Sequence, residues 1–344
     1  MSDELNQIIR EMPKIDLHRH LEGSLRLETL LAIATEYEIA LPTFDMEGFR
    51  PFVQMVPGDP RSSQQFLGKF QVLRQFYRSK AIIKRVTYEV IADAAADNVK
   101  YMELRFTPQA LNNLMHCDYQ EVVNWVCEAV DQAVQTLDIQ VVLILSMNRH
   151  ESVEIGEQVL QAAIDFADRG VVGLDLAGQE PGHSGLPFRD LFERAKAEGF
   201  GVTIHAGEWA GAANVREAVE VLGADRIGHG IRMVEDPLLF DLLQTRGTVL
   251  EVCPTSNVQS GAVADFNVHP LIPLYKNGIK TTINTDDPLI CNVTMSDEIA
   301  QVMRTMSFSL DDVKKNLLMA ARAAFLPPTK RAALVAQFQD WLYP

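Results

Sequence analysis

The chain has 344 residues, of which 47% are hydrophobic, a composition typical of a globular protein with a large core rather than of a disordered one. Its 31 Lys and Arg and 46 Asp and Glu give a net charge of −15 at pH 7, which disfavours nucleic acid and anionic membranes as partners but not a small neutral molecule. No run of 18 apolar residues and no signal-peptide pattern is present, so we expect no membrane span and no secretion signal.

The four cysteines are scattered and form no C-x-x-C pair; they are Cys117, Cys127, Cys253 and Cys291. This spacing is typical of reduced thiols rather than of a disulfide framework or a cysteine zinc site. We therefore expect a cytoplasmic protein.

Eight short apolar runs rich in β-branched residues recur along the chain, and each is predicted to be a strand. They lie at 14–18, 99–106, 140–147, 171–177, 201–205, 226–229, 248–253 and 279–284. Several are apolar almost throughout, as parallel strands buried on both faces are. Helical patterns fill most of the gaps, at 119–137, 152–169, 188–198, 214–222 and 237–246, and the segment 296–343 is helical. This alternation predicts one (β/α)8 barrel, a TIM barrel, as a single domain over residues 1–344.

The first crossover, between the first and second predicted strands, is much longer than the others. It contains helical patterns at 24–37 and 63–96, and between them a loop that carries Pro42, Pro51, Pro57 and Pro60. Long excursions from a barrel are usually functional. We therefore expect extra helices here, and residues 44–62 as a lid over the pocket.

Polar residues that are unusual in a core follow the predicted strands. They are His18, His20, Glu103, Arg105, Gly178, Gln179, His205, Glu208, His229, Asp286 and Asp287. The carboxyl ends of barrel strands face one mouth, where active sites are built, so these residues should converge in space. For Glu103 and Arg105 we expect a buried ion pair at this mouth and no catalytic role.

His18 and His20 stand at i and i+2 on a strand, so their side chains share a face. Two such histidines alone could simply be hydrogen-bonded. Together with His205 and Asp286 they offer three nitrogens and one oxygen, a ligand set that suits Zn²⁺ and is also open to Fe²⁺, Co²⁺ and Mn²⁺. The fourth strand ends without a lysine that could bridge a second metal, so we expect one metal per chain.

Glu208 follows His205 by three residues, and the two side chains point the same way if a helical turn follows. A carboxyl group beside a metal but not bound to it can shuttle a proton, although a carboxylate at a helix start can also be structural. His229 would be either a ligand or the group that orients the water activated by the metal.

Seven segments, in this order, resemble the adenosine deaminase family: 16–24 (DLHRHLEGS), 101–105 (YMELR), 175–178 (DLAG), 205–208 (HAGE), 226–230 (RIGHG), 255–257 (TSN) and 284–288 (NTDDP). The resemblance covers roughly residues 12–330 and implies a zinc-dependent barrel hydrolase that converts adenosine to inosine and ammonia in purine salvage. It implies one Zn²⁺ held by His18, His20, His205 and Asp286. It also implies Glu208 as the proton donor to purine N1 and His229 as the residue that orients the attacking oxygen.

The resemblance further implies that Asp287 contacts purine N7, that the Gly178 amide meets N3, and that Glu22 and His20 contact the substrate, Glu22 at the ribose. Glu22 stands where many adenosine deaminases have Asp and resembles adenine deaminases, whereas 255–261 resembles bacterial adenosine deaminases. The predicted substrates are therefore adenosine and 2′-deoxyadenosine. The alternatives are adenine or a ribose-modified 6-aminopurine nucleoside such as aminodeoxyfutalosine.

Two other classes of protein remain to be separated from a deaminase by measurement. A barrel that only binds a purine would release no ammonia. A metal-dependent amide or phosphoester hydrolase on the same barrel would need a second metal or a different acid.

Overall fold

The computed structural model describes residues 2–344 and confirms the predicted barrel. Eight parallel strands pair in chain order. They are β1 (Lys14–His20), β2 (Val99–Phe106), β3 (Gln140–Asn148), β4 (Val171–Ala177), β5 (Gly201–Ala206), β6 (Arg226–His229), β7 (Val249–Val252) and β8 (Thr281–Ile283). Each lies within two residues of its predicted bounds, because runs that are buried on both faces are marked by their apolar side chains.

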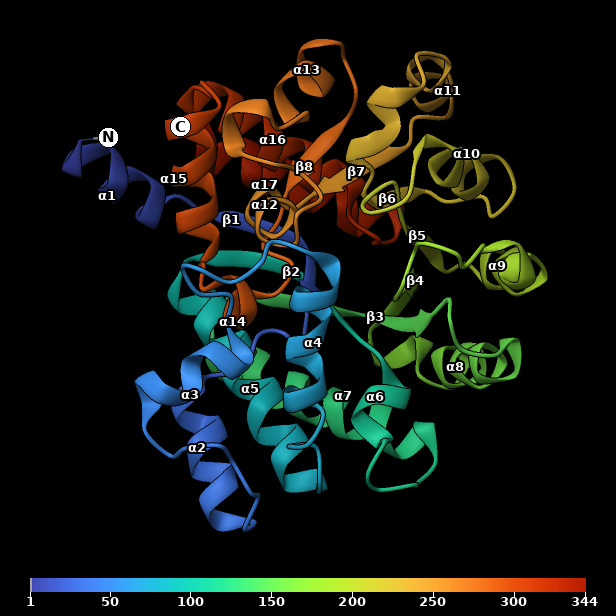
Figure 1. Ribbon diagram of the computed structural model, residues 1–344. Coiled ribbons are helices and arrows are strands. Elements are labelled where there is room, and N and C mark those ends of the chain that lie inside the picture. Colours follow the sequence, from blue (N-terminus) through green and yellow to red (C-terminus); the bar gives the residue numbers. More distant parts are fainter. Residues whose placement is uncertain (1) are drawn as a thin grey trace.

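Helices surround the strands, as Figure 1 shows. The α-helices are α1 (Asp3–Glu11), α2 (Leu27–Glu36), α3 (Met46–Val53), α4 (Ser63–Leu73), α5 (Lys80–Ala96), α6 (Pro108–Asn112), α7 (Tyr119–Thr136), α8 (Val153–Asp165), α9 (Arg189–Ala197), α10 (Ala212–Glu220), α11 (Leu238–Arg246), α12 (Pro254–Gln259), α13 (Leu271–Lys276), α14 (Pro288–Cys291), α15 (Met295–Thr305), α16 (Leu310–Ala323) and α17 (Pro328–Leu342). Four 3-10 turns complete the set: η1 (Ala167–Arg169), η2 (Leu186–Phe188), η3 (Ile231–Glu235) and η4 (Phe266–Val268). None of the helices within residues 2–344 has the length and apolarity needed to cross a membrane.

The first crossover holds four helices, α2 to α5, and differs from the prediction in two ways. The proline-bearing stretch expected as a loop contains α3, because Asp45 accepts a hydrogen bond from the Gly48 amide at 2.7 Å and Phe49 and Val53 are buried, which outweighs Pro51 inside the helix. The lid prediction was also misplaced. The pocket described below is lined by Phe66, Leu67 and Phe70 of α4 and by no residue of 44–62.

Charged side chains fill the inside of the barrel. We call Glu103, Arg105, Asp175, Arg226 and Glu251 the interior ion network; all are buried. Arg226 contacts Glu103 and Glu251, each at 2.5 Å, and Arg105 contacts Glu251 at 2.8 Å and Asp175 at 3.6 Å. The expected pairing of Glu103 with Arg105 is therefore wrong. Both side chains point inward, but each meets a cation or anion from a strand across the barrel instead of its neighbour on β2.

The C-terminal segment closes the floor of the barrel beneath this network. The Phe325 amide donates to Glu103 Oε1 at 2.6 Å, and the Phe325 ring lies 3.5 Å from the Arg226 guanidinium carbon. Arg226 also donates to the carbonyl of Ala323 at 2.8 Å. The link between α16 and α17 is thus bonded directly to the ion network.

The barrel closes between β8 and β1 by a sparse seam. In residues 2–344 a single isolated backbone bridge, Arg19 with Asp286, joins the two sides. Side chains supply further bonds, since Asn284 Oδ1 accepts from the Leu17 amide at 3.0 Å and the Thr285 hydroxyl donates to Asp16 at 2.6 Å. This seam lies directly beside the site residues.

Candidate metal centre and active site

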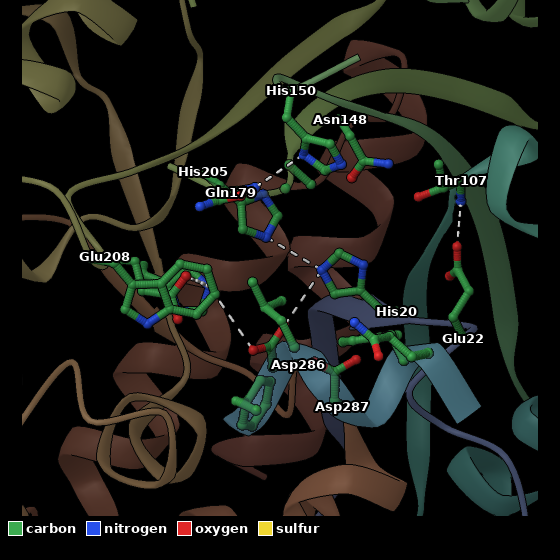
Figure 2. Close-up of a pocket in the computed structure, with 18 of the residues that line it drawn as sticks. His20, Glu22, Thr107, Asn148, His150, Gln179, His205, Glu208, Asp286 and Asp287 are labelled. Atoms are coloured by element: carbon green, nitrogen blue, oxygen red, sulfur yellow. Dashed lines mark hydrogen bonds and ion pairs between the residues drawn. The ribbon is translucent and has the colours of Figure 1, made fainter. Parts of the chain in front are cut away.

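A cavity of about 280 Å³ opens at the carboxyl ends of the strands. All predicted site residues except one line it: His20, Glu22, Gly178, His205, Glu208, His229, Asp286 and Asp287. The exception, His18, is fully buried and lies against three of the other histidine rings. The barrel thus brings together residues at the carboxyl ends of β1, β4, β5, β6 and β8, as predicted. Figure 2 shows His20, Glu22, His205, Glu208, Asp286 and Asp287 around the cavity.

Four of these side chains converge on one point. His18 Nε2 lies 3.2 Å and His20 Nε2 3.4 Å from Asp286 Oδ1, and His20 Nε2 lies 3.3 Å from His205 Nε2. Each of the four residues offers one ligand atom to a group whose atoms all lie within 4.8 Å of one another. His18 Nε2 is buried and has no hydrogen-bond donor or acceptor partner within residues 2–344. Nitrogens and an oxygen at this spacing match the ligand set of a zinc-type metal.

Carboxylates behind the histidines fix which ring nitrogen faces this point. Glu251 Oε2 lies 2.7 Å from His18 Nδ1, and Asp175 Oδ1 lies 2.8 Å from His205 Nδ1. A carboxylate at Nδ1 holds the proton there and leaves Nε2 free as a ligand. Burial opposes the charge on Glu251, but Arg105 and Arg226 hold its pKa well below the ordinary range. The interior ion network therefore supports the histidines from below.

Two residues of the site have left-handed backbone conformations. His229 has φ 60° and Asp286 has φ 63°, where residues with a Cβ are uncommon. Each ends or follows a strand at the mouth, and the positive φ turns its side chain into the cavity. Such strain costs about 1–3 kcal/mol and is typical of functional positions.

Glu208 lies beside His229 in a closed environment. It is 3% exposed, and its Oε2 is 3.5 Å from His229 Nε2. Burial raises the pKa of Glu208 well above its ordinary value, and the negative charges of Asp286 and Glu180 raise it further. These effects favour the protonated form of Glu208, which can act as an acid.

The neighbouring aspartates Asp286 and Asp287 have opposite protonation preferences. Burial opposes the charge of Asp286, but His18, whose Nε2 lies 3.2 Å from Oδ1, and the nearby His229 hold its pKa well below the ordinary range. Burial and the charges of Asp286 and Glu22 raise the pKa of Asp287 well above it. These effects favour the neutral form of Asp287, which can donate a hydrogen bond into the cavity.

Gly23 makes the position of Asp287 possible. A Cβ at Gly23 would lie 1.8 Å from Asp287 Oδ1, so only glycine fits. Asp287 Oδ1 is buried and has no hydrogen-bond partner within residues 2–344. This oxygen is available to a ligand.

Glu22 lies across the cavity from Glu208 (Figure 2). Its Oε1 accepts a hydrogen bond from the Thr107 amide at 2.7 Å, and its Oε2 is buried without a partner in the described chain. Burial raises the pKa of Glu22 to about 6. A polar ligand group placed here would find one free carboxyl oxygen.

A second possible ligand group shares His18 and Asp286 and adds His229 and Cys253. It would require the thiolate of Cys253. The Cys253 thiol is fully buried, which raises its pKa well above the ordinary range, and Sγ–H points to the Glu251 carbonyl at 3.6 Å. The four-residue group with His20 and His205 is therefore the better metal site.

The sequence reasoning did not assign the supporting residues Asp175, Glu251 and Glu180. Asp175 and Glu251 are charged residues at inward positions of otherwise apolar strands, and that mismatch was the available signal. Glu180 follows β4 in a polar loop, where a carboxylate carries no such signal.

Comparison with known proteins agrees with this geometry. The family model described as adenosine deaminase matches residues 13–341. An adenosine deaminase from Clostridium botulinum is 36% identical over 330 residues, 94% of this chain and 96% of that protein. Among solved structures, the chain is similar to an adenine deaminase from Arthrobacter aurescens (27% identity, 97% of this chain and 100% of that one, TM-score 0.85). It is also similar to an amidohydrolase with bound zinc from Burkholderia ambifaria (26% identity, 99% of this chain and 93% of that one, TM-score 0.85).

Proposed function

The chain belongs to the adenosine deaminase family, and on that premise we propose how its cavity hydrolyses adenosine to inosine and ammonia. The observation that carries the proposal is the convergence of four metal-ligand atoms and one buried carboxyl group, that of Glu208, whose pKa is raised by burial. The metal-dependent chemistry of the family needs both.

We propose one zinc ion per chain, held by His18, His20, His205 and Asp286. The unpartnered Nε2 of His18 and the carboxylates behind His18 and His205 support this choice, because they prepare neutral imidazoles as ligands. When bound, such a metal lowers the pKa of a water molecule to about 7 and so supplies a nucleophile near neutral pH.

His229 and Asp286 would position the attacking water. Asp286 Oδ2 is held by the Ser256 hydroxyl at 2.6 Å and lies 3.9 Å from His229 Nε2, a separation that one water oxygen can bridge. Asn257 Nδ2 lies 2.9 Å from His229 Nδ1, and donation from this amide leaves the proton of the neutral ring on Nε2. His229 Nε2–H would then donate to the water oxygen, while Asp286 Oδ2 accepts its proton.

Glu208 would protonate purine N1. C6 is a poor electrophile until N1 carries a proton, so donation from Glu208 prepares C6 for attack. The water oxygen bonds to C6, the C6–N6 bond breaks, and the oxygen remains as the carbonyl of inosine. Of the two protons of the water, one leaves on ammonia and the other restores Glu208.

The remaining residues would orient the nucleoside. The protonated Asp287 would donate to N7, the Gly178 amide would donate to N3, and the free oxygen of Glu22 would accept from a ribose hydroxyl. His20 would contact the substrate from the metal side. Adenosine is favoured over adenine because the relatives at 36% identity are adenosine deaminases, whereas the adenine deaminase of known structure is 27% identical.

We also propose that the enzyme works in the cytoplasm on purine nucleosides in salvage, adenosine and 2′-deoxyadenosine alike. All four of its cysteines are free, as thiols in a reducing compartment are.

Ammonia release tests the proposal. Zinc-loaded protein should release ammonia from adenosine and much less from adenine. Glu208→Gln should lower kcat by about three orders of magnitude while it keeps the metal, because removal of a positioned acid costs about 10²–10⁴-fold. An active Glu208→Gln protein would overturn the role of Glu208, and a preference for adenine would overturn the role of Glu22 at a ribose.

A further inference from the structure

One buried carboxylate holds the backbone that carries the acid. Glu180, 2% exposed, lies three residues after β4, and its two oxygens face the loop after β5. Oε1 accepts a hydrogen bond from the Gly207 amide at 2.6 Å. Oε2 accepts from the amides of Glu208, Trp209 and Ala210 at 3.1, 2.9 and 2.9 Å. Four successive amides of one loop therefore point at one side chain.

The conformation of this loop depends on that carboxylate. Residues 207–210 lie between β5 and α10, outside any helix or strand, so no ladder or helical bonds satisfy their amides. Gly207 has φ +68°, which turns the following amides to the same side. Successive amides in such an arrangement form a concave site for a negative charge. Here the negative charge comes from the protein itself.

The side chain of Glu208 has no comparable support of its own. Within residues 2–344 its carboxyl group makes no hydrogen bond, and its Oε2 lies 3.5 Å from His229 Nε2. Its position in the cavity must therefore be set by the backbone from which it projects. The amide of Glu208 is bonded to Glu180, as are the amides on both sides of it.

The same loop after β4 also reaches the cavity. Gly178, two residues before Glu180, lines the cavity with φ +86°. Arg149, itself buried, bonds the carbonyls of His183 and His205, and its positive charge interacts with Glu180. The segment that would contact the purine and the segment that would protonate it are thus bonded to each other through Glu180.

We propose that Glu180 is a positioning residue for the deamination: its carboxylate sets the place of the Glu208 carboxyl group relative to purine N1. This inference rests on the proposed function, since it takes Glu208 as the acid. The role predicts a loss in kcat without loss of substrate or metal binding, because a displacement of about 1 Å can cost about 10²-fold in rate.

Glu180→Gln tests this role with little change in size. A glutamine amide nitrogen cannot accept the bonds that one carboxylate oxygen accepts, so part of the loop loses its partners. The matched control is Glu217→Gln, because Glu217 also holds a loop amide, that of Gly185 at 2.7 Å, whereas the amides of 207–210 bond to Glu180. Glu208→Gln is measured beside them.

The readouts separate positioning from folding. Each protein is assayed for kcat and KM with adenosine, for zinc content, and for the Ki of 1-deazaadenosine, in which a C–H replaces N1 and no proton is needed. For Glu180→Gln we expect kcat to fall about 100-fold with KM, Ki and zinc content within about threefold, and for Glu217→Gln kcat within about threefold. Two results would overturn the proposal. One is a loss of 1-deazaadenosine affinity or of zinc binding as large as the loss of kcat, and the other is a kcat within about threefold of the wild type.

Two further measurements decide the case if Glu180→Gln does not fold. Glu180→Asp keeps the charge but withdraws it by one methylene group, so kcat should fall while Ki is kept. In the wild-type protein, hydrogen exchange should show the amides of 207–210 as protected as those of β5; exchange at the rate of an open loop would refute the geometry. If Glu208→Gln remains active, the proposed function fails, whereas an inactive Glu208→Gln beside a fully active Glu180→Gln refutes only the role of Glu180.

Discussion

Replacement of Arg226 by methionine tests how much the interior ion network stabilises the barrel. Met keeps an unbranched apolar side chain and has no charge. It would remove the contacts at 2.5 Å to Glu103 and to Glu251, the bond to the Ala323 carbonyl and the contact with the Phe325 ring. Glu251 would keep Arg105 as a partner, but no other cation in the described chain contacts Glu103.

The size of the expected loss in stability follows from the burial of the Arg226–Glu103 ion pair. Arg226 and Glu103 are 1% and 0% exposed, so water does not screen the carboxylate that is left. Loss of one partner of such a buried pair costs about 3–5 kcal/mol. A chain of 344 residues unfolds with an entropy of about 0.7 kcal/mol per kelvin, so Tm should fall by about 4–7 °C.

The assay is calorimetry of the zinc-loaded protein at pH 7, with Arg194→Met as the control. Arg194 pairs with Glu157 at 2.6 Å, but the two side chains are 57% and 41% exposed, so Tm should move by about 1 °C or less. The double variant with Glu103→Gln should recover part of the loss, because the unpaired charge is then gone. A Tm of Arg226→Met equal to that of Arg194→Met would refute the reasoning.

Three further predictions concern the site. Glu251→Gln should weaken zinc binding about 10–100-fold in a competition titration, because Glu251 would orient His18, one of the proposed ligands. Gly23→Ala should lower kcat/KM for adenosine about 100-fold, since its Cβ would displace Asp287, whereas Gly68→Ala, which meets nothing within 4 Å, should not. Burial raises the pKa of Glu298 to about 7 from 4.5, so its contribution to stability, up to about 3 kcal/mol, is present below pH 4.5 and is lost as pH rises through 7. Urea unfolding at pH 5 and pH 8 should show this loss in the wild type and less of it in Glu298→Gln.

The strands and the site residues were predictable from the sequence for a common reason. A strand buried on both faces has an unmistakable apolar run, and a polar residue at the end of such a run has few reasons to be there except function. His18, His205 and Asp286 were found in this way, and the barrel then fixed their convergence. At these three positions, the apolar run that predicts the strand and the barrel that places its end lead to the same site.

Partners across the barrel could not be predicted, because they depend on which side chains meet in three dimensions. Glu103 and Arg105 are neighbours on one strand, yet each pairs with a residue from another strand. Helix α3 was likewise hidden by Pro51, because the burial of Phe49 and Val53 that offsets the proline is seen only in the folded chain. Glu180 was missed because its partners are backbone amides, which leave no mark in the sequence.

Because few backbone bonds join β1 to β8, a metal bound at the site would also hold these two strands together. His18 and His20 come from the first strand and Asp286 from the end of the last, so one ion would cross-link the two edges where backbone pairing is weakest. Such a cross-link closes a loop that runs from residue 20 to residue 286, and closure of a long loop strongly restricts an unfolded polypeptide. It can form only after β8 has been synthesised and has docked on β1. Metal binding would therefore be a late step in folding, and loss of the metal would first open the barrel at the end that carries the active site.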